Sequence, residues 1–118
     1  MGKESGKYPL RIKFYKMTFS GKEPVREWLR SLPKEVKKII GEDIMTVQMT
    51  WPIGMPLVKN LGKKLLEIRS SLPEGIARIF FIVRSGEMVL LHGFIKKTQK
   101  TPVQELEIAR DRMKDFQE

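Results

Sequence analysis

Residues 88–102, MVLLHGFIKKTQKTP, pass from an apolar segment through a group of lysines to the beginning of a helix. The apolar half is typical of a buried β-strand. Three lysines, at positions 96, 97 and 100, lie within five residues, and the stretch contains no acidic residue. Because crowded like charges repel, we expect an anion from outside the chain to balance them, and a phosphate is the obvious candidate.

The segments before this stretch have the alternation of a small sheet. Residues 10–16 at first alternate apolar and basic side chains, which indicates a strand with one wet face. Residues 65–70 alternate in the same way. Residues 75–83 are apolar apart from Arg78, which is typical of a central strand buried on both faces. The Ser85-Gly86 turn predicts that residues 87–95 return antiparallel to it.

Apolar stripes at helical spacing predict a helical hairpin over residues 22–50, begun by a capping box at residues 20–23 and interrupted at Pro33. A second capping box, at residues 101–104, predicts a final helix over residues 102–116. Residues 55–64, rich in Gly, Pro and Lys, are expected to be a connection.

The predicted fold class is α+β: a small, mainly antiparallel sheet flanked by helices, in the order β-α-α-β-β-β-α. We expect one domain over residues 10–118 after a disordered tail at residues 1–9.

The net charge of +9 favours an anionic partner, such as nucleic acid, an acidic protein or an anionic membrane surface. The surplus is concentrated in residues 59–100, which carry nine Lys or Arg and three Glu. With no cysteine and one histidine, neither a disulfide nor a zinc site is expected, and no cofactor is predicted. No apolar run has the length of a membrane span, so we expect a cytoplasmic protein without a membrane partner.

The candidate site residues are cations on the predicted central strands and at the end of the last one. Arg78 interrupts an apolar strand, so it either grips a phosphate or pairs with Glu67 on the neighbouring strand. Only one of Lys96 and Lys97 should point into a given site, because successive strand residues face opposite sides. The other candidates are Arg69 and His92 as catalytic groups, and Lys59, Lys63, Lys64 and Lys100 as RNA-binding residues.

These residues suit cleavage of RNA, because RNA carries its own nucleophile, the 2′-OH. The protein then has to clamp the phosphate, neutralise its developing charge and move protons. The sequence shows no paired carboxylates for a two-metal nuclease, and its one histidine has no evident partner for a Ser-His-Asp arrangement.

Three blocks of sequence resemble the RelE/HigB superfamily of type II toxin–antitoxin toxins, in particular its phage-derived HigB-like branch. They are LLEIR at residues 65–69, RIFF at 78–81 and LLHGFIKKTQKTP at 90–102, followed by Glu105, Glu107 and Ala109. The resemblance covers about residues 10–116. It implies an RelE-like fold and a ribosome-dependent endoribonuclease that cleaves translated mRNA without a metal.

The resemblance also implies a cognate antitoxin, of the helix-turn-helix, HigA-like kind, as the partner of the toxin. By motif position, the family's active-site cations correspond to Arg69, Arg78, Lys96 and Lys97.

Two other functions fit the same sequence. A ParE-like, non-enzymatic toxin would poison DNA gyrase through protein contacts made by the helical hairpin. A non-catalytic RNA-binding module would show strongly salt-sensitive binding without cleavage.

Overall fold

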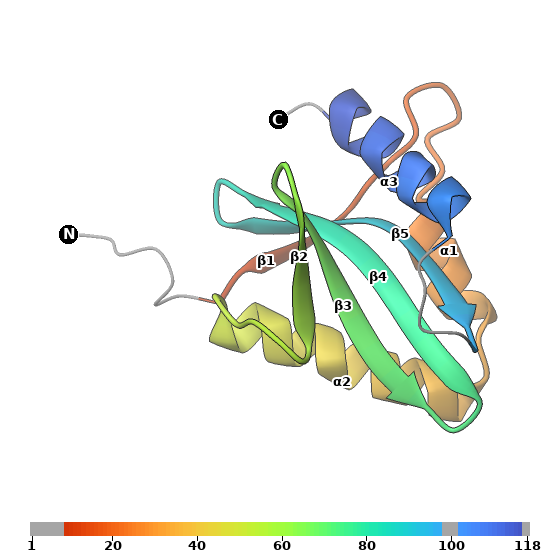
Figure 1. Cartoon of the computed structure of the whole chain (residues 1–118). Helices are drawn as coiled ribbons and strands as arrows, with labels where there is room; N and C mark the ends of the chain where they lie inside the picture. The colour runs from red at the N-terminus through yellow and green to blue at the C-terminus, as the bar shows by residue number, and fades with distance from the viewer. Residues whose placement is uncertain (1–8, 98–101, 117–118) are drawn as a thin grey trace.

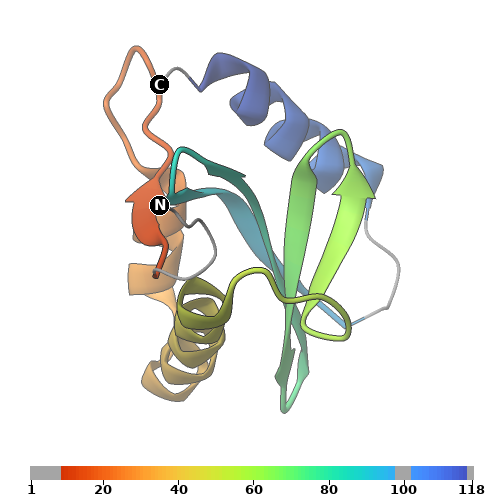
Figure 2. The ribbon, with the colours of Figure 1, turned by 90° about the vertical axis from the view of Figure 1, so that its left-hand side faces the viewer.

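The computed structural model describes residues 9–97 and 102–116. Within them a single sheet separates two layers of helix (Figures 1 and 2). The elements are β1 (Arg11–Phe14), α1 (Pro24–Ser31), α2 (Lys34–Thr50), β2 (Val58–Gly62), β3 (Leu65–Leu72), β4 (Gly75–Arg84), β5 (Glu87–Lys96) and α3 (Val103–Asp115).

The sheet has the strand order β1-β5-β4-β3-β2. Strands β2 to β5 pair antiparallel, and β1 joins β5 in parallel. This confirms the α+β class, the three consecutive antiparallel strands and the entry of the first strand into the same sheet. Helices α1 and α2 pack on one face, and α3 crosses the other (Figure 1).

The prediction was wrong at β2, which lies inside the expected connection at residues 55–64. The strand is short, and its sequence VKNLG has only two apolar side chains. Its pairing with β3 is irregular between Asn60 and Gly62. Such a strand forms because it pairs with its neighbour, not because its own residues alternate, so the sequence pattern did not predict it.

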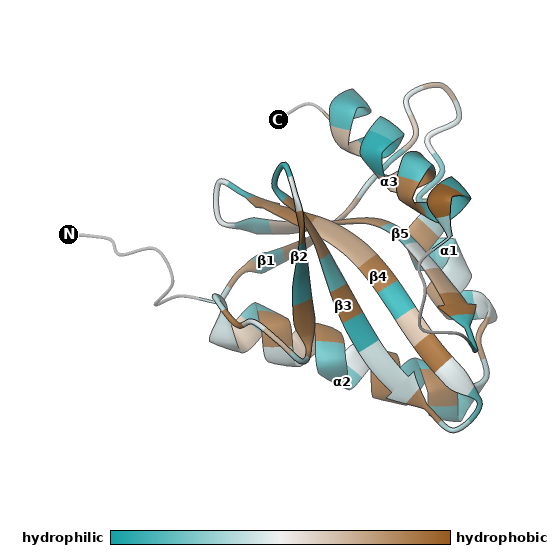
Figure 3. Ribbon diagram, in the orientation of Figure 1, coloured by the Kyte–Doolittle hydropathy of each residue, from teal (hydrophilic) through white to brown (hydrophobic). Residues whose placement is uncertain are grey.

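The apolar character of β4 follows from its place in the middle of the sheet. Ala77, Ile79 and Phe81 belong to the core shared with α1 and α2, whereas Phe80 and Ile82 belong to the core under α3. Figure 3 shows β4 as a mostly hydrophobic ribbon interrupted by a hydrophilic band. A strand covered on both faces must be apolar at successive positions, as the sequence predicted.

The predicted capping box at residues 20–23 is wrong. The N-cap of α1 is Glu23, which makes no side-chain capping bond, and the Ser20 hydroxyl instead accepts from the backbone N–H of Lys22. Thr101, expected to cap the last helix, lies outside the described residues. The N-cap of α3 is Pro102.

The last strand contacts α1 through a glycine. A Cβ placed on Gly93 would lie 2.4 Å from Cζ3 of Trp28, much closer than two carbon atoms can approach. The missing side chain therefore allows the six-membered ring of Trp28 to approach β5 at this residue, and this contact fixes how closely α1 approaches the sheet.

We predict that Gly93→Ala destabilises the protein by about 1–3 kcal/mol, because the added methyl group forces the Trp28 ring or α1 to move. The matched control is Gly41→Ala in α2, where nothing lies within 4 Å of the added Cβ. That change should raise stability by up to about 1 kcal/mol. Urea unfolding measures both, and equal stabilities for the two variants would contradict the packing described here.

Candidate anion-binding site

The candidate site lies on the sheet face that also carries α3, called here the front face. Side chains alternate along β3, so Leu66 and Ile68, in the core shared with α2, leave Glu67 and Arg69 on the front face. The register then extends the face across the sheet. Lys59 pairs with Glu67, Arg69 with Arg78, and Lys96 with Ile76, two residues before Arg78.

Four cations from four strands are thus neighbours on the described part of the front face, with one carboxylate among them. They are Lys59, Arg69, Arg78 and Lys96, and the carboxylate is Glu67. Directly opposite residues in an antiparallel pair have Cβ atoms about 5 Å apart, and diagonal ones about 7–8 Å. In Figure 1, α3 crosses the half of this face that lies away from the C-terminal ends of β3 and β5. No described helix lies over the half where these two strands end.

Arg78 is not exposed in this site, contrary to the expectation that it grips a phosphate directly. Its side chain is 1% exposed, that of Glu67 is 0% exposed, and Arg78 Nη1 lies 3.3 Å from Glu67 Oε2. Strand β4 is covered on both faces, so its only central cation is covered as well. The alternative of a cross-strand ion pair with Glu67 is therefore correct.

Arg69 and Lys96 are the accessible cations on the strands beside Arg78, and Lys59, on the edge strand β2, is exposed farther along the same face. Arg69 is half-buried and lines a cavity of about 560 Å³ between α2 and the edge of β3, together with Asp43, Ser71 and Ile76. Lys96 is exposed at the end of β5. Arg69 is thus partly accessible at the edge of β3, and Lys96 is accessible at the end of β5.

The other predicted lysines do not join them. Lys97 lies on the opposite side and lines a cavity of about 640 Å³ with Pro33, Val36 and Leu72. Lys63 and Lys64 occupy the β2–β3 turn with positive φ angles of 51° and 73°. That turn is at the other end of β3, on the order of 20 Å from the level of Lys96. Lys100 lies outside the described residues.

His92 lies on the front face beneath the beginning of α3, where both ring nitrogens have partners. Nε2 is 2.5 Å from Glu105 Oε1, and Nδ1 is 3.3 Å from Nη1 of Arg112. The ring packs against both Phe80 and Phe94, whose own ring centroids lie 5.7 Å apart. Burial lowers the pKa of His92 from its ordinary value of 6.5, and the nearby Arg112 adds to the effect, although Glu105 opposes it. The neutral ring then donates from Nε2 to Glu105 and accepts at Nδ1 from Arg112.

Sequence reasoning missed Glu105 and Arg112 as partners of His92. They lie seven residues apart on α3, two turns of one helical face, and that spacing was the signal that could have identified them. Arg112 also donates to the carbonyl oxygen of Leu91 and lies over the ring of Tyr15. These bonds attach α3 to β5.

The arrangement can bind an anion. Arginine offers a planar fork that matches phosphate oxygens, and lysine a mobile point charge. Across residues 9–97 and 102–116, no three His, Asp or Glu side chains gather as metal ligands. In the same part of the chain, no helix combines the length and the apolar character that a membrane crossing requires.

A family model described as phage derived protein Gp49-like (DUF891) matches residues 27–114, or 88 of the 118 residues. The chain belongs to this family. Gp49-like proteins are associated with toxins of the RelE type. The match contains the strands that carry the front-face cations, and it excludes β1. No curated protein matches the sequence.

We predict that Arg78→Met lowers the free energy of unfolding by about 3–5 kcal/mol, because it leaves the Glu67 carboxylate buried without this guanidinium. The double variant Glu67→Leu/Arg78→Met removes both charges and should recover most of the loss. Urea denaturation of the two variants makes the comparison. If the single variant were as stable as the wild type, the buried pair would not be the constraint described here.

We predict that the His92 imidazole titrates below pH 6.5 in the folded protein. A lowered pKa means that the unfolded chain binds more protons, so stability is lost as the pH falls from about 6.5 to the folded pKa and is retained above 6.5. NMR follows the ring directly, since the chain has one histidine. Glu105→Gln should lower the pKa further, because it removes the charge that raises it. An unchanged or higher pKa in that variant would rule out the His92–Glu105 contact.

Proposed function

We propose that the protein is the toxin of a type II toxin–antitoxin system, of the HigB-like branch, and that it cleaves translated mRNA on the ribosome. One observation carries the proposal: the strand register brings Arg69 and Lys96 beside the buried Arg78 on the open half of the front face. The family's association with RelE-type toxins supports it.

The proposed reaction uses the nucleophile of the substrate. The 2′-OH of one nucleotide loses its proton to water and attacks the adjacent phosphorus, the bond to the 5′-oxygen breaks, and the products carry a 2′,3′-cyclic phosphate and a 5′-OH. Arg69 and Lys96 hold the non-bridging oxygens, where negative charge grows in the transition state. In this proposal Lys96 also gives a proton to the leaving 5′-oxygen and regains one from water.

Arg78 and His92 have supporting roles in this proposal. Arg78, held by Glu67, keeps a fixed positive charge beneath the phosphate without touching it. Both nitrogens of His92 are already hydrogen-bonded within the protein, so the ring fixes α3 at the border of the site rather than carrying a proton to the substrate. The proposed partner that silences the toxin is a helix-turn-helix antitoxin of the HigA kind.

A gyrase-directed, ParE-like function is the second candidate, and one observation favours it. Met45 and Met49, four residues apart on α2, are 54% and 58% exposed, which gives the helical hairpin an apolar surface for protein contacts. That function would need α2 and would not need the front-face cations.

We predict that Lys96→Ala lowers mRNA cleavage by about 100-fold or more, because one transition-state contact of this kind commonly contributes that much. Arg69→Ala should have a similar effect. The matched control is Lys97→Ala, which removes the same charge from the adjacent residue on the opposite side and should leave cleavage unchanged. The measurement is induced expression followed by mapping of new mRNA 5′ ends, with growth recorded in parallel.

Discrete cuts inside translated frames, lost in the Lys96 and Arg69 variants and retained in the Lys97 variant, are the expected result. Growth arrest without such cuts, accompanied by gyrase-linked DNA breaks, would contradict the proposal and support the ParE-like function. Equal loss of mRNA cleavage in all three variants would show that cleavage depends on the net charge of the protein rather than on the front face.

A further inference from the structure

Strand β1 is an edge of the sheet, and its outer side carries hydrogen-bonding positions without a backbone partner among residues 9–97 and 102–116. In the parallel ladder with β5, the N–H groups of Arg11 and Tyr15 bond to the carbonyls of Gly86 and Leu90. In a parallel pair, the backbone N–H and C=O groups of every second residue point to the same neighbouring strand. The backbone N–H and C=O groups of Ile12 and Phe14 therefore point away from β5, along the outer edge.

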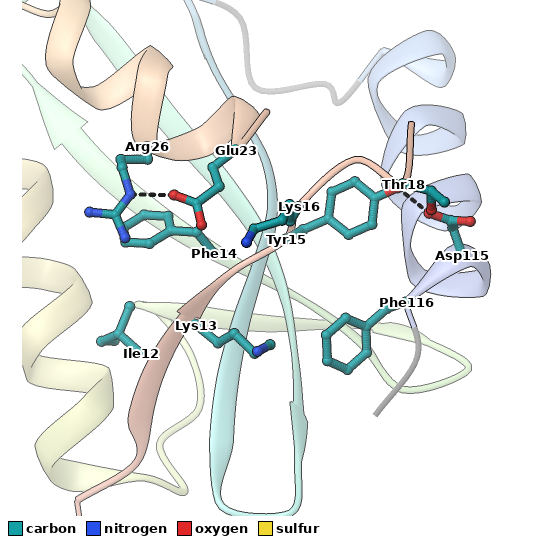
Figure 4. Close-up of a pocket in the computed structure, with 10 residues that line it drawn as sticks. All are labelled: Ile12, Lys13, Phe14, Tyr15, Lys16, Thr18, Glu23, Arg26, Asp115 and Phe116. Atoms are coloured by element: carbon teal, nitrogen blue, oxygen red, sulfur yellow. Dashed lines mark hydrogen bonds and ion pairs between the residues drawn. The ribbon is translucent and has the colours of Figure 1, made fainter. Parts of the chain in front are cut away.

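A cavity of about 510 Å³ runs along this edge (Figure 4). Its lining includes the five consecutive residues 12–16, with Arg26 from α1 and Phe116 after α3. Figure 4 shows Ile12 and Phe14 on the side toward α1, and Lys13 pointing to the other side, toward Phe116. Side chains from both faces of a strand can line one cavity only if the cavity follows the strand's edge.

The charges that line this edge leave it basic. Its two carboxylates are engaged within the protein: Glu23 pairs with Arg26 at 2.5 Å, and Asp115 accepts from Tyr15 at 2.5 Å and from Thr18 at 2.9 Å. The two hydroxyls lower the pKa of Asp115, while burial and this carboxylate raise the pKa of Tyr15 to about 12. The lysines at positions 13 and 16 are exposed, and neither has an ion-pair partner among residues 9–97 and 102–116.

Two apolar side chains are exposed in the turn that follows β1. Phe19 is fully exposed, and Met17 is 39% exposed. The turn that carries them is held by backbone bonds, from Met17 N–H to the Lys22 carbonyl and from Gly21 N–H to the Met17 carbonyl. An exposed aromatic ring in a fixed turn beside an open strand edge is a typical anchor for a partner chain.

We propose that the outer edge of β1 binds an extended, acidic segment of another protein, which adds to the sheet as a further strand. The backbone groups of Ile12 and Phe14 would pair with the added strand, since main-chain bonds provide affinity in this mode of recognition. Acidic side chains of the segment would meet Lys13 and Lys16, and an apolar one would cover Phe19. The inference is independent of the proposed ribonuclease activity, because it uses none of the front-face cations.

Two other occupants fit the edge less well. A second copy of this chain would bring the lysines of two identical edges together, and like charges across a strand pair are destabilising. An RNA backbone cannot form the alternating main-chain bonds that the edge offers. A lysine on a short edge strand also discourages aggregation. That role alone does not account for the cavity or for the exposed Phe19.

The test uses the purified full chain and a phage-displayed library of random twelve-residue peptides. We expect the selected peptides to be rich in Asp and Glu, with alternating Val, Ile or Phe. Their affinity should fall at least 10-fold for Lys13→Glu/Lys16→Glu, and separately for Phe19→Ser. The matched control is Lys37→Glu/Lys38→Glu on the exposed side of α2, which makes the same change in net charge and should leave binding intact.

Hydrogen exchange identifies the edge itself: a bound peptide should slow exchange of the Ile12 and Phe14 amides. Several results would overturn the proposal. They are a library that yields no binder, an equal loss of affinity in the α2 control, unchanged exchange at Ile12 and Phe14, and dimerisation of the free chain through this edge. Binding of oligouridylate that depended on Lys13 and Lys16, without protection of these amides, would assign the surface to nucleic acid instead.

Discussion

The buried ion pair between Glu67 and Arg78 is the constraint on which the front face depends. A guanidinium in the middle of a strand covered on both faces is tolerated only when a carboxylate meets it, and Glu67 on β3 does so at 3.3 Å. A slip of β3 against β4 by one residue would carry Glu67 to the face shared with α2 and leave Arg78 without it. The pair thus fixes the register, and the register brings Arg69 and Lys96 to the same open surface.

The sequence correctly predicted the strands in which the pattern of apolar and polar side chains reflects which residues are buried. Strands β3, β4 and β5 were evident because they alternate or are apolar throughout, and each contacts a core. Strand β2 was not evident, since a short polar segment becomes a strand only when a partner supplies the ladder. The cap of α1 was mispredicted for a similar reason. Ser20 has the correct residue type, but its hydroxyl bonds to Lys22 instead.

For the site, residue types were predictable and directions were not. Alternation indicated that only one of Lys96 and Lys97 would face the site. The structure identifies that residue as Lys96, because Lys96 pairs with Ile76 whereas Lys97 lies beside Val36. The exposure of Arg78 depended on whether Glu67 reached it, a contact between strands that sequence left as an alternative. The basic edge at Lys13 and Lys16 was hidden, because it requires knowing that β1 is the last strand of the sheet.

The central claim is that the anion-binding surface is the open half of the front face. The most direct measurement is an NMR titration of the full chain with a short single-stranded 2′-deoxy oligonucleotide, which lacks the 2′-OH nucleophile and so binds without being cleaved. The account predicts shifts at the Arg69 guanidinium and the Lys96 ammonium that decrease as salt rises, with Lys97 and the α2 lysines unchanged. Shifts centred on α1 and α2, with Arg69 and Lys96 unaffected, would contradict it.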